Sequence, residues 1–336
     1  MQIKRLLPSQ LKEAVALADR VFKPEDGSMG KNFPLLFSKE NAQNILVVEE
    51  NGRIVSMVGI MFVQAQIFSS RLKIALVGSV CTDEAFRKRG YSTRLMYKAE
   101  KISLENNAAL MMIHGDNSIY RNFGAVDTGR YFTVTVKANS VREISTLTFR
   151  KARYSDIDRM MVWHSREPIR FIRPPERFKI FHKTQHAWDG KAETFINDFS
   201  YIAVVKRKKF SDCIESAGEP KAIVDLVHAF SSENGPIIMH MDPVKGAMLK
   251  PFLGTLKPRK FLGTMKVLSK ELLIEQLKDY FEEALSKSDR NHLLDKLMEF
   301  DNLSEFTNAV FGEEERKINS HILPIPLPDY HGMDYI

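Results

Sequence analysis

Arg87-Lys88-Arg89-Gly90-Tyr91-Ser92 links an apolar segment, residues 72–82, to a segment whose apolar residues have helical spacing. The apolar segment predicts a buried strand, and the positions that mark the helix are Leu95, Met96, Ala99 and Ile102. Gly90 permits a tight turn, and the N–H groups at the start of the helix predict a seat for a pyrophosphate. The basic side chains before Gly90 add positive charge to that seat. An ordinary connection between a strand and a helix is the alternative that this stretch leaves open.

Strands and helices alternate on both sides of this loop over residues 1–140. The expected strands are residues 3–7, 44–50, 54–65, 72–82, 108–114 and 130–137. Helices are expected after Pro8, after Ser92 and at residues 119–123. Asn51-Gly52 predicts a tight hairpin turn between the second and third strands. The strand at 130–137 is expected to close this unit, so the predicted fold class is α+β with a mixed sheet.

The pattern restarts near residue 146, which predicts an internal duplication. Residues 3–11 (IKRLLPSQL) and 149–157 (FRKARYSDI) share a strand, a serine and a helix start at one offset. Residues 201–206 and 221–230 are expected to repeat the first hairpin with a longer loop between them. Nothing in the second copy corresponds to the Arg-x-x-Gly-x-Ser loop. The expected domains are 1–140, which is intact, and 146–265, which is degenerate, with residues 139–146 as the linker.

Residues 266–336 are expected to form a short, mainly helical C-terminal region. Ser269 is the expected N-cap of a first helix that extends to Ala284, and two further helices are expected at 293–300 and 303–310. The tail that follows contains ILPIPLP at residues 322–328, and alternate prolines exclude a helix there. Because this tail is apolar, we expect it to be buried and to hold the terminal residue in a fixed place.

The composition is typical of a folded globular protein: 44% of the 336 residues are hydrophobic and 27% are charged. The net charge of +7 comes without a long basic block, so it argues against a nucleic-acid partner. Cys81 and Cys213 are too few for a disulfide framework or a cysteine-rich zinc site, and no metal is expected. Neither a signal peptide nor a spanning helix is recognisable, so the prediction is a cytoplasmic protein without a membrane partner.

The loop around Gly90 resembles the Gln/Arg-x-x-Gly-x-Gly/Ala signature of the GNAT superfamily of acetyl-CoA-dependent N-acetyltransferases. Arg87, Gly90 and Ser92 occupy its three defining positions, and serine at the third is a small departure. The resemblance covers residues 1–140 and implies acetyl-CoA as the co-substrate. The residues it implies beside the pantetheine arm are Val80, Cys81 and Thr82. Those it implies around the pyrophosphate are Arg87, Lys88, Arg89, Gly90, Tyr91, Ser92 and Thr93.

Residues 118–124 (SIYRNFG) resemble the Ile-Tyr-x-x-Phe-Gly element of the enhanced-intracellular-survival (Eis) type of acetyltransferase. Such proteins join two acetyltransferase-like units to a sterol-carrier-like domain, so the resemblance implies tandem units and a homo-oligomer. It implies that Tyr120 is the general acid and that the main-chain carboxylate of Ile336 is the second catalytic group. Two features depart from the family: residues 266–336 are too short for a complete sterol-carrier-like sheet, and Gly115-Asp116 replace its usual pair.

The chemistry of acyl transfer suits these groups. A lysine-like amine has a pKa near 10.4 and must lose a proton, and a phenol of pKa about 10 can reprotonate the departing thiolate. Backbone N–H groups at residues 80–82 could hold the charge that develops on the thioester oxygen. Glu25 and Asp26, in the loop 23–30, are candidates for holding a cationic acceptor.

Each of these assignments has a simpler alternative. Tyr120 could be an ordinary half-buried tyrosine, the chain end at Ile336 could be mobile, and the acids of the loop 23–30 could be merely solvated. Cys81 is interpreted as a small buried strand residue rather than a nucleophile. The run REPIRFIRPPER at 166–177 could be a packed surface loop or a loop near an anionic ligand.

The function predicted from the sequence is transfer of an acetyl group from acetyl-CoA to a primary amine by direct attack in a ternary complex. The acceptor would be a small molecule or a protein. The alternatives are a non-catalytic acyl-CoA-binding regulator and an aminoacyl-tRNA-dependent transferase.

Overall fold

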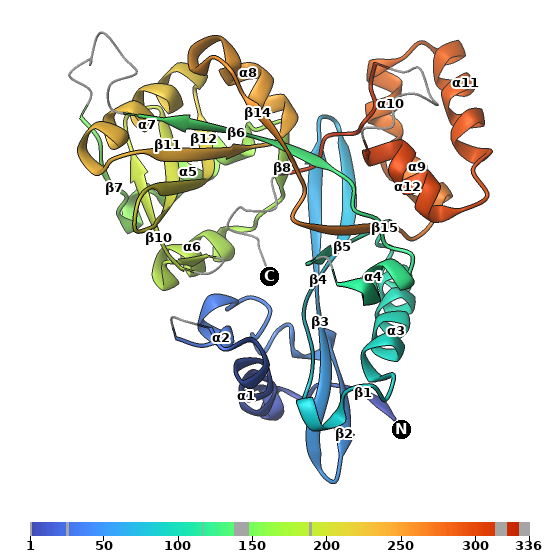
Figure 1. Cartoon of the computed structure of the whole chain (residues 1–336). Helices are drawn as coiled ribbons and strands as arrows, with labels where there is room; N and C mark the ends of the chain where they lie inside the picture. Colours follow the sequence, from blue (N-terminus) through green and yellow to red (C-terminus); the bar gives the residue numbers. More distant parts are fainter. Residues whose placement is uncertain are drawn as a thin grey trace. The chain divides into compact units, whose positions relative to one another are not determined.

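The computed structural model describes residues 2–24, 27–115, 117–137, 148–187, 190–312 and 321–328. They form two compact units, each built on its own sheet (Figure 1). The first unit combines residues 1–129 with 261–325, and the second combines 130–260 with the tail from residue 326. Within the described ranges, no helix combines the length and the apolar character that crossing a membrane requires.

The sheet of the first unit has the strand order β1-β2-β3-β4-β5-β15. Its strands are β1 (Ile3–Arg5), β2 (Ile45–Glu50), β3 (Arg53–Ile67), β4 (Ser70–Thr82), β5 (Leu110–His114) and β15 (Gly263–Val267). Its helices are α1 (Leu11–Phe22), α2 (Met29–Asn32), α3 (Tyr91–Glu105), α4 (Ser118–Asn122), α9 (Lys270–Gln276), α10 (Lys278–Ala284), α11 (Lys287–Met298) and α12 (Leu303–Phe311). In Figure 1, α1 and α2 lie on one side of this sheet, and α3 and α4 lie on the other.

The strands on this path pair antiparallel, except that β4 and β5 are parallel. A parallel pair needs a crossover connection, and α3 supplies it. The face of α3 that packs into the core carries Leu95, Met96, Ala99 and Ile102, the four positions whose spacing predicted the helix. The expected strands up to residue 114 are likewise confirmed, with shifts of a few residues at their ends.

The second unit repeats this plan, with the strand order β14-β6-β13-β12-β11-β10-β7. The strands on this path are β6 (Arg130–Val136), β7 (Arg150–Lys151), β10 (Gly190–Ile196), β11 (Ser200–Lys206), β12 (Ser211–Gly218), β13 (Ile237–Met241) and β14 (Lys257–Lys260). The short strands β8 (Ile169–Phe171) and β9 (His186–Ala187) lie off this path. Its helices are α5 (Ile157–Ser165), α6 (Pro175–Thr184), α7 (Pro220–Asn234) and α8 (Pro243–Leu253). β12 and β13 form a parallel pair joined by α7, as β4 and β5 are joined by α3. The topology therefore supports the predicted tandem arrangement.

The strand at 130–137 does not close the first sheet, so that prediction is wrong. β6 pairs with β13 and β14 in the second sheet, and the place beside β5 in the first sheet is taken by β15. The alternation of apolar and polar residues predicts a strand in either sheet, and it carries no information on which neighbour the strand finds.

Residues 221–230 are helical and do not form a second hairpin strand, which is a further correction. Pro220 stands at the start of α7, where a proline fits a helix, and Ile223, Val227 and Phe230 recur at helical spacing on its buried side. The partner that β11 pairs with on this side is β12.

The C-terminal region is helical at the expected places. Ser269 caps α9, since its Oγ accepts a hydrogen bond from the N–H of Leu272 (3.1 Å). The single helix expected up to Ala284 is two helices, because the chain leaves helical geometry at Leu277. The tail at 322–328 buries its apolar side chains as predicted.

The two units meet along the chain at 129–130 and 260–261, whereas the sequence pattern suggested boundaries at 140 and 265. The expected linker, 139–146, lies outside the described residues.

Candidate functional site

The parallel strands β4 and β5 separate at the end where the signature loop begins. They pair only from Ile74 to Val77 on β4, although β4 continues to Thr82. On its other side β4 carries a bulge opposite β3, because Gly59 pairs with Gly78 and Met57 pairs with Cys81. The extra residue lies in this stretch, where Ser79 has φ +50°, and a bulge of this kind bends its strand. Residues 78–82 have no partner on β5, which ends at His114, and this leaves a gap beside the end of β4.

The signature loop follows a 3₁₀ turn at Glu84–Phe86 and brings the chain into α3. Gly90 has φ +75°, the left-handed conformation that glycine adopts without strain. Nothing lies within 4 Å of the position where a Cβ would stand, so the turn is open to a ligand. Within the described residues no side chain caps the start of α3, so its first N–H groups are available to an anion.

The basic side chains of the loop are exposed beside this helix start. The guanidinium of Arg89 lies 4.9 Å from the centroid of the Phe86 ring, a cation–π contact. The Nε of Arg87 donates to the carbonyl of Thr82 at 3.5 Å. Both side chains are therefore oriented by the loop itself while their charge remains in solvent.

A line of hydroxyl groups ties the helix start to β4. The Oγ of Ser92 lies 2.8 Å from Oγ1 of Thr82, and that oxygen lies 2.7 Å from Oγ of Ser56. Ser56 donates its only hydrogen to the carbonyl of Cys81 (3.1 Å). Since each hydroxyl has one hydrogen, Thr82 must donate to Ser56, and Ser92 must donate to Thr82. Serine at the third signature position is therefore used as a hydrogen-bond donor that fixes α3 against the strand.

Tyr120 lies on α4, which begins at Asn117. The Oδ1 of Asn117 accepts the N–H of Ile119 (3.1 Å) and starts this short helix. The side chain of Tyr120 is buried, with 7% of the residue exposed, and burial raises its pKa to about 12. Burial also raises the pKa of the Cys81 thiol to about 12. At neutral pH both groups keep their protons, so Cys81 has no thiolate with which to act as a nucleophile.

The gap, the loop and α4 enclose one cleft of about 890 Å³. Its lining includes Tyr120 and all ten residues that the resemblance implied around the coenzyme, at 80–82 and 87–93. Val21 and Phe22 at the end of α1 complete the wall. Glu25, Asp26 and Ile336 lie outside the described residues.

Three contributors to this site were not identified from the sequence. Ser79 was hidden inside an apolar run, and its buried Oγ has no hydrogen-bond partner in the described structure. Phe22 is 44% exposed, and an exposed aromatic at a helix end is the kind of signal that could have marked it. Lys266 on β15 donates a hydrogen bond to the carbonyl at the end of α4, and these residues are too far apart in the sequence for a local pattern to predict the contact.

The cleft thus combines a glycine turn into an uncapped helix with a buried tyrosine, which are the residues that the resemblance to acetyl-CoA-dependent acetyltransferases singled out. Residues 2–126 match the family model described as "Acetyltransferase (GNAT) domain". By this match the N-terminal part of the chain is a GNAT acetyltransferase domain, which supports an acyltransferase.

Solved structures extend the likeness in fold to most of the chain. It resembles a GCN5-related N-acetyltransferase from Kribbella flavida with a TM-score of 0.63 and 15% identity, over 82% of this chain and 73% of that one. A GCN5-related N-acetyltransferase from Anabaena variabilis gives 0.65 and 10% identity, over 82% and 74%. Eis1 from Mycobacterium abscessus gives 0.59 and 12% identity, over 80% and 74%, so the fold is consistent with the Eis type. No match was found among curated proteins.

Proposed function

We propose that this acyltransferase moves an acetyl group from acetyl-CoA to a primary amine by direct attack within a ternary complex. The observation that carries the proposal is the cleft of about 890 Å³ that joins an uncapped helix start to the buried phenol of Tyr120. A volume of this order is typical of sites for a cofactor-sized ligand.

The residues divide between binding and chemistry. The N–H groups of Tyr91, Ser92 and Thr93 at the start of α3 hold the diphosphate, and the exposed basic side chains at 87–89 add charge around it. The edge of β4 that leaves β5 accepts the pantetheine arm along Val80–Thr82. Backbone N–H groups on that edge stabilise the negative charge that develops on the thioester oxygen as the amine attacks.

Tyr120 acts as the general acid. When the carbon–sulfur bond breaks, the phenol donates its proton to the departing sulfur, and the free thiol of coenzyme A leaves. On the acceptor side, Glu25 and Asp26 in the loop 23–30 are proposed to hold a cationic amine because of their charge. The carboxylate of Ile336, which rests on the resemblance alone, would take the proton of the amine.

The decisive experiment is a free-thiol release assay with acetyl-CoA across a panel of polyamines, aminoglycosides, amino acids and lysine peptides. A thermal shift with coenzyme A alone is measured in parallel. The proposal expects stabilisation by coenzyme A and thiol release with at least one amine. Stabilisation without thiol release on the whole panel would favour the acyl-CoA-binding regulator. Salt-sensitive tRNA binding without any effect of coenzyme A would favour the aminoacyl transferase.

A further inference from the structure

The second unit has a pocket at the place that corresponds to the cleft of the first. β12 and β13 pair from Ser211 to Cys213 on β12 and then separate, as β4 and β5 do. The pocket lies at this separation, and its volume is about 50 Å³. It is lined by residues 214–216 of β12, residues 240–242 at the end of β13, and side chains from α5, α8 and the segment 167–173, which contains β8. A cavity of this size holds a small ligand or a few water molecules.

Coenzyme A does not suit this second pocket. The helix that follows β12, α7, begins at Glu219 and Pro220, where the first unit has its basic loop and Gly90. Proline removes an N–H donor from the helix start, and a carboxylate stands where an anion would bind. The second unit therefore has the strand topology of the first, but the start of α7 lacks the features that would bind a diphosphate.

One wall of the pocket is a buried ion pair. Arg173 donates to both carboxylate oxygens of Glu215, at 3.0 and 2.7 Å, and only 1% of its side chain is exposed. The hydroxyl of Tyr201 donates to the same carboxylate at 2.6 Å. The Arg173 guanidinium offsets the cost of burial and holds the pKa of Glu215 well below its usual range. Glu215 is therefore charged and has its hydrogen bonds satisfied within the protein.

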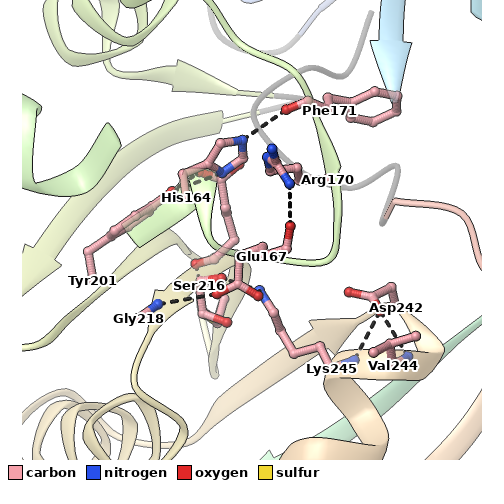
Figure 2. A network of polar contacts seen from close by, with 12 residues as sticks. His164, Glu167, Arg170, Phe171, Tyr201, Ser216, Gly218, Asp242, Val244 and Lys245 are labelled. Carbon is pink, nitrogen blue, oxygen red and sulfur yellow. Dashed lines mark hydrogen bonds and ion pairs between the residues drawn. The ribbon is translucent and has the colours of Figure 1, made fainter. Parts of the chain in front are cut away.

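The pocket lining also carries a second ion pair, between Lys245 at the start of α8 and Glu167 (Figure 2). The Nζ of Lys245 lies 3.2 Å from Oε2 of Glu167 and also donates to the carbonyl of Ser216. Although burial opposes the charged ammonium, the charge of Glu167 raises the pKa of Lys245 above its ordinary value. An ammonium donates three hydrogen bonds, and the described residues account for two of them.

Ser216 supplies a second hydrogen-bond donor without a partner among the described residues. Ser216 lines the pocket, it is 3% exposed, and its Oγ makes no hydrogen bond in the described structure. A buried hydroxyl without a partner costs free energy, which a bound ligand would recover. Lys245 Nζ and Ser216 Oγ together offer two donors that suit one carboxylate.

Among the described residues that line the pocket, the three basic side chains are Arg170, Arg173 and Lys245, and the three acidic ones are Glu167, Glu215 and Asp242. A ligand with a single charge would leave that charge uncompensated in a poorly solvated place, whereas a zwitterion adds no net charge.

We propose that this pocket binds a small zwitterion of the α-amino acid class. Its carboxylate accepts hydrogen bonds from Lys245 and Ser216, and its ammonium donates to the carboxylates of Glu167 and Asp242. The proposal does not depend on acyl transfer, because binding alone tests it.

The test uses the full chain and three probes of similar size: glycine, acetate and methylammonium. Binding is measured by calorimetry and by the shift in unfolding temperature at constant ionic strength. We expect glycine to bind at least tenfold more tightly than either singly charged probe. Equal binding of the three, or no binding of glycine and of larger α-amino acids, would overturn the proposal.

The informative variant is Ser216→Ala. Because it removes an unsatisfied buried hydroxyl, it should leave the unfolding temperature unchanged or raise it, while glycine affinity falls about tenfold with the loss of a hydrogen bond to a charged group. Ser211→Ala, on the same strand but outside the pocket lining, is the matched control and should bind glycine like the unaltered chain. Glycine binding that is the same in both variants would show that the amino acid binds elsewhere.

Discussion

Tyr120 and Cys81 lie on the same cleft, and burial raises the pKa of each to about 12. At neutral pH both groups therefore keep their protons, and the phenol of Tyr120 is available as the proton donor for the proposed transfer to the leaving sulfur.

Replacing Tyr120 with phenylalanine removes the proton donor and keeps the ring. We expect turnover to fall about a hundredfold or more, the usual contribution of a positioned general acid, while the Kd for acetyl-CoA changes little. The matched control is Tyr97→Phe, at a half-exposed tyrosine on α3 that does not line the cleft, and its turnover should be unchanged. Steady-state kinetics together with calorimetric binding of coenzyme A separate the two effects. Full turnover in Tyr120→Phe would remove the phenol from the mechanism.

The raised pKa of Tyr120 also predicts the form of the pH profile. Since the phenol holds its proton up to about pH 12, kcat should rise with pH as the acceptor amine loses its proton, without an alkaline fall below about pH 10. The measurement is kcat from about pH 6 to pH 10 with saturating acetyl-CoA. An alkaline fall centred between pH 8 and 9 would mean that a group other than Tyr120 supplies the proton.

The signature loop at residues 87–92 was predictable from the sequence. The hydrogen bonds that hold it against the sheet were not. Arg87, Gly90 and Ser92 are recognisable because their residue types and spacing are local. The hydroxyl line from Ser92 to Ser56 joins residues far apart in the chain, and only the folded sheet brings them together.

Among the elements, β15 contacts both helices of the site although it lies more than 130 residues further along the chain. Its Lys266 donates to the carbonyl of Phe123 at the end of α4 (2.9 Å) and forms an ion pair with Glu100 of α3 (2.6 Å). The same ammonium lies 3.9 Å from the centroid of the Phe123 ring. One buried side chain thus connects the helix that bears Tyr120 to the helix proposed to hold the diphosphate.

Lys266→Met should test this connection. Breaking a buried pair leaves Glu100 without its partner, so we expect a loss of about 3 kcal/mol in the free energy of unfolding, measured with urea. The double variant Lys266→Met/Glu100→Leu removes both charges and should recover most of that loss. Lys278→Met, at a largely exposed ion pair on α10, serves as the control and should change stability by less than about 0.5 kcal/mol. A loss no larger than in the control would mean that the pair does not hold α4.

Element types followed from the sequence wherever the periodicity was long and unbroken, as in α3 and β4. The helix α7 was misassigned because residues 221–230 are apolar enough to suit a buried strand, and Pro220 was not used as a sign of a helix start. The exchange of β6 and β15 between the sheets could not be predicted. A strand's own sequence fixes which of its faces is buried and does not fix which neighbour it pairs with.

At the scale of the whole molecule, the second unit is inserted into the first. Residues 130–260 are continuous in sequence and contribute the complete strand path from β6 to β14, whereas the first unit needs residues 261–325 to cover β5. The two ends of the insertion are adjacent, since the N–H of Phe261 donates to the carbonyl of Gly129 (3.1 Å). The predicted tandem arrangement captured the repeated topology. A boundary at 140, however, falls after the insertion point and would separate β6 from β13 and β14, its neighbours in the second sheet.

Fragments of the chain should therefore fold unequally. Residues 130–260 should give a cooperative urea transition and dispersed amide resonances, because they contain every strand on the path of the second sheet. Residues 1–140 should not, because β5 would lose β15 from its edge and an exposed apolar strand edge favours aggregation. Joining residue 129 to residue 261 through a short glycine turn, with 130–260 deleted, should restore a folded first unit that coenzyme A stabilises. A folded fragment 1–140 that coenzyme A stabilises by itself would show that β15 is dispensable and that the first unit is complete without the C-terminal segment.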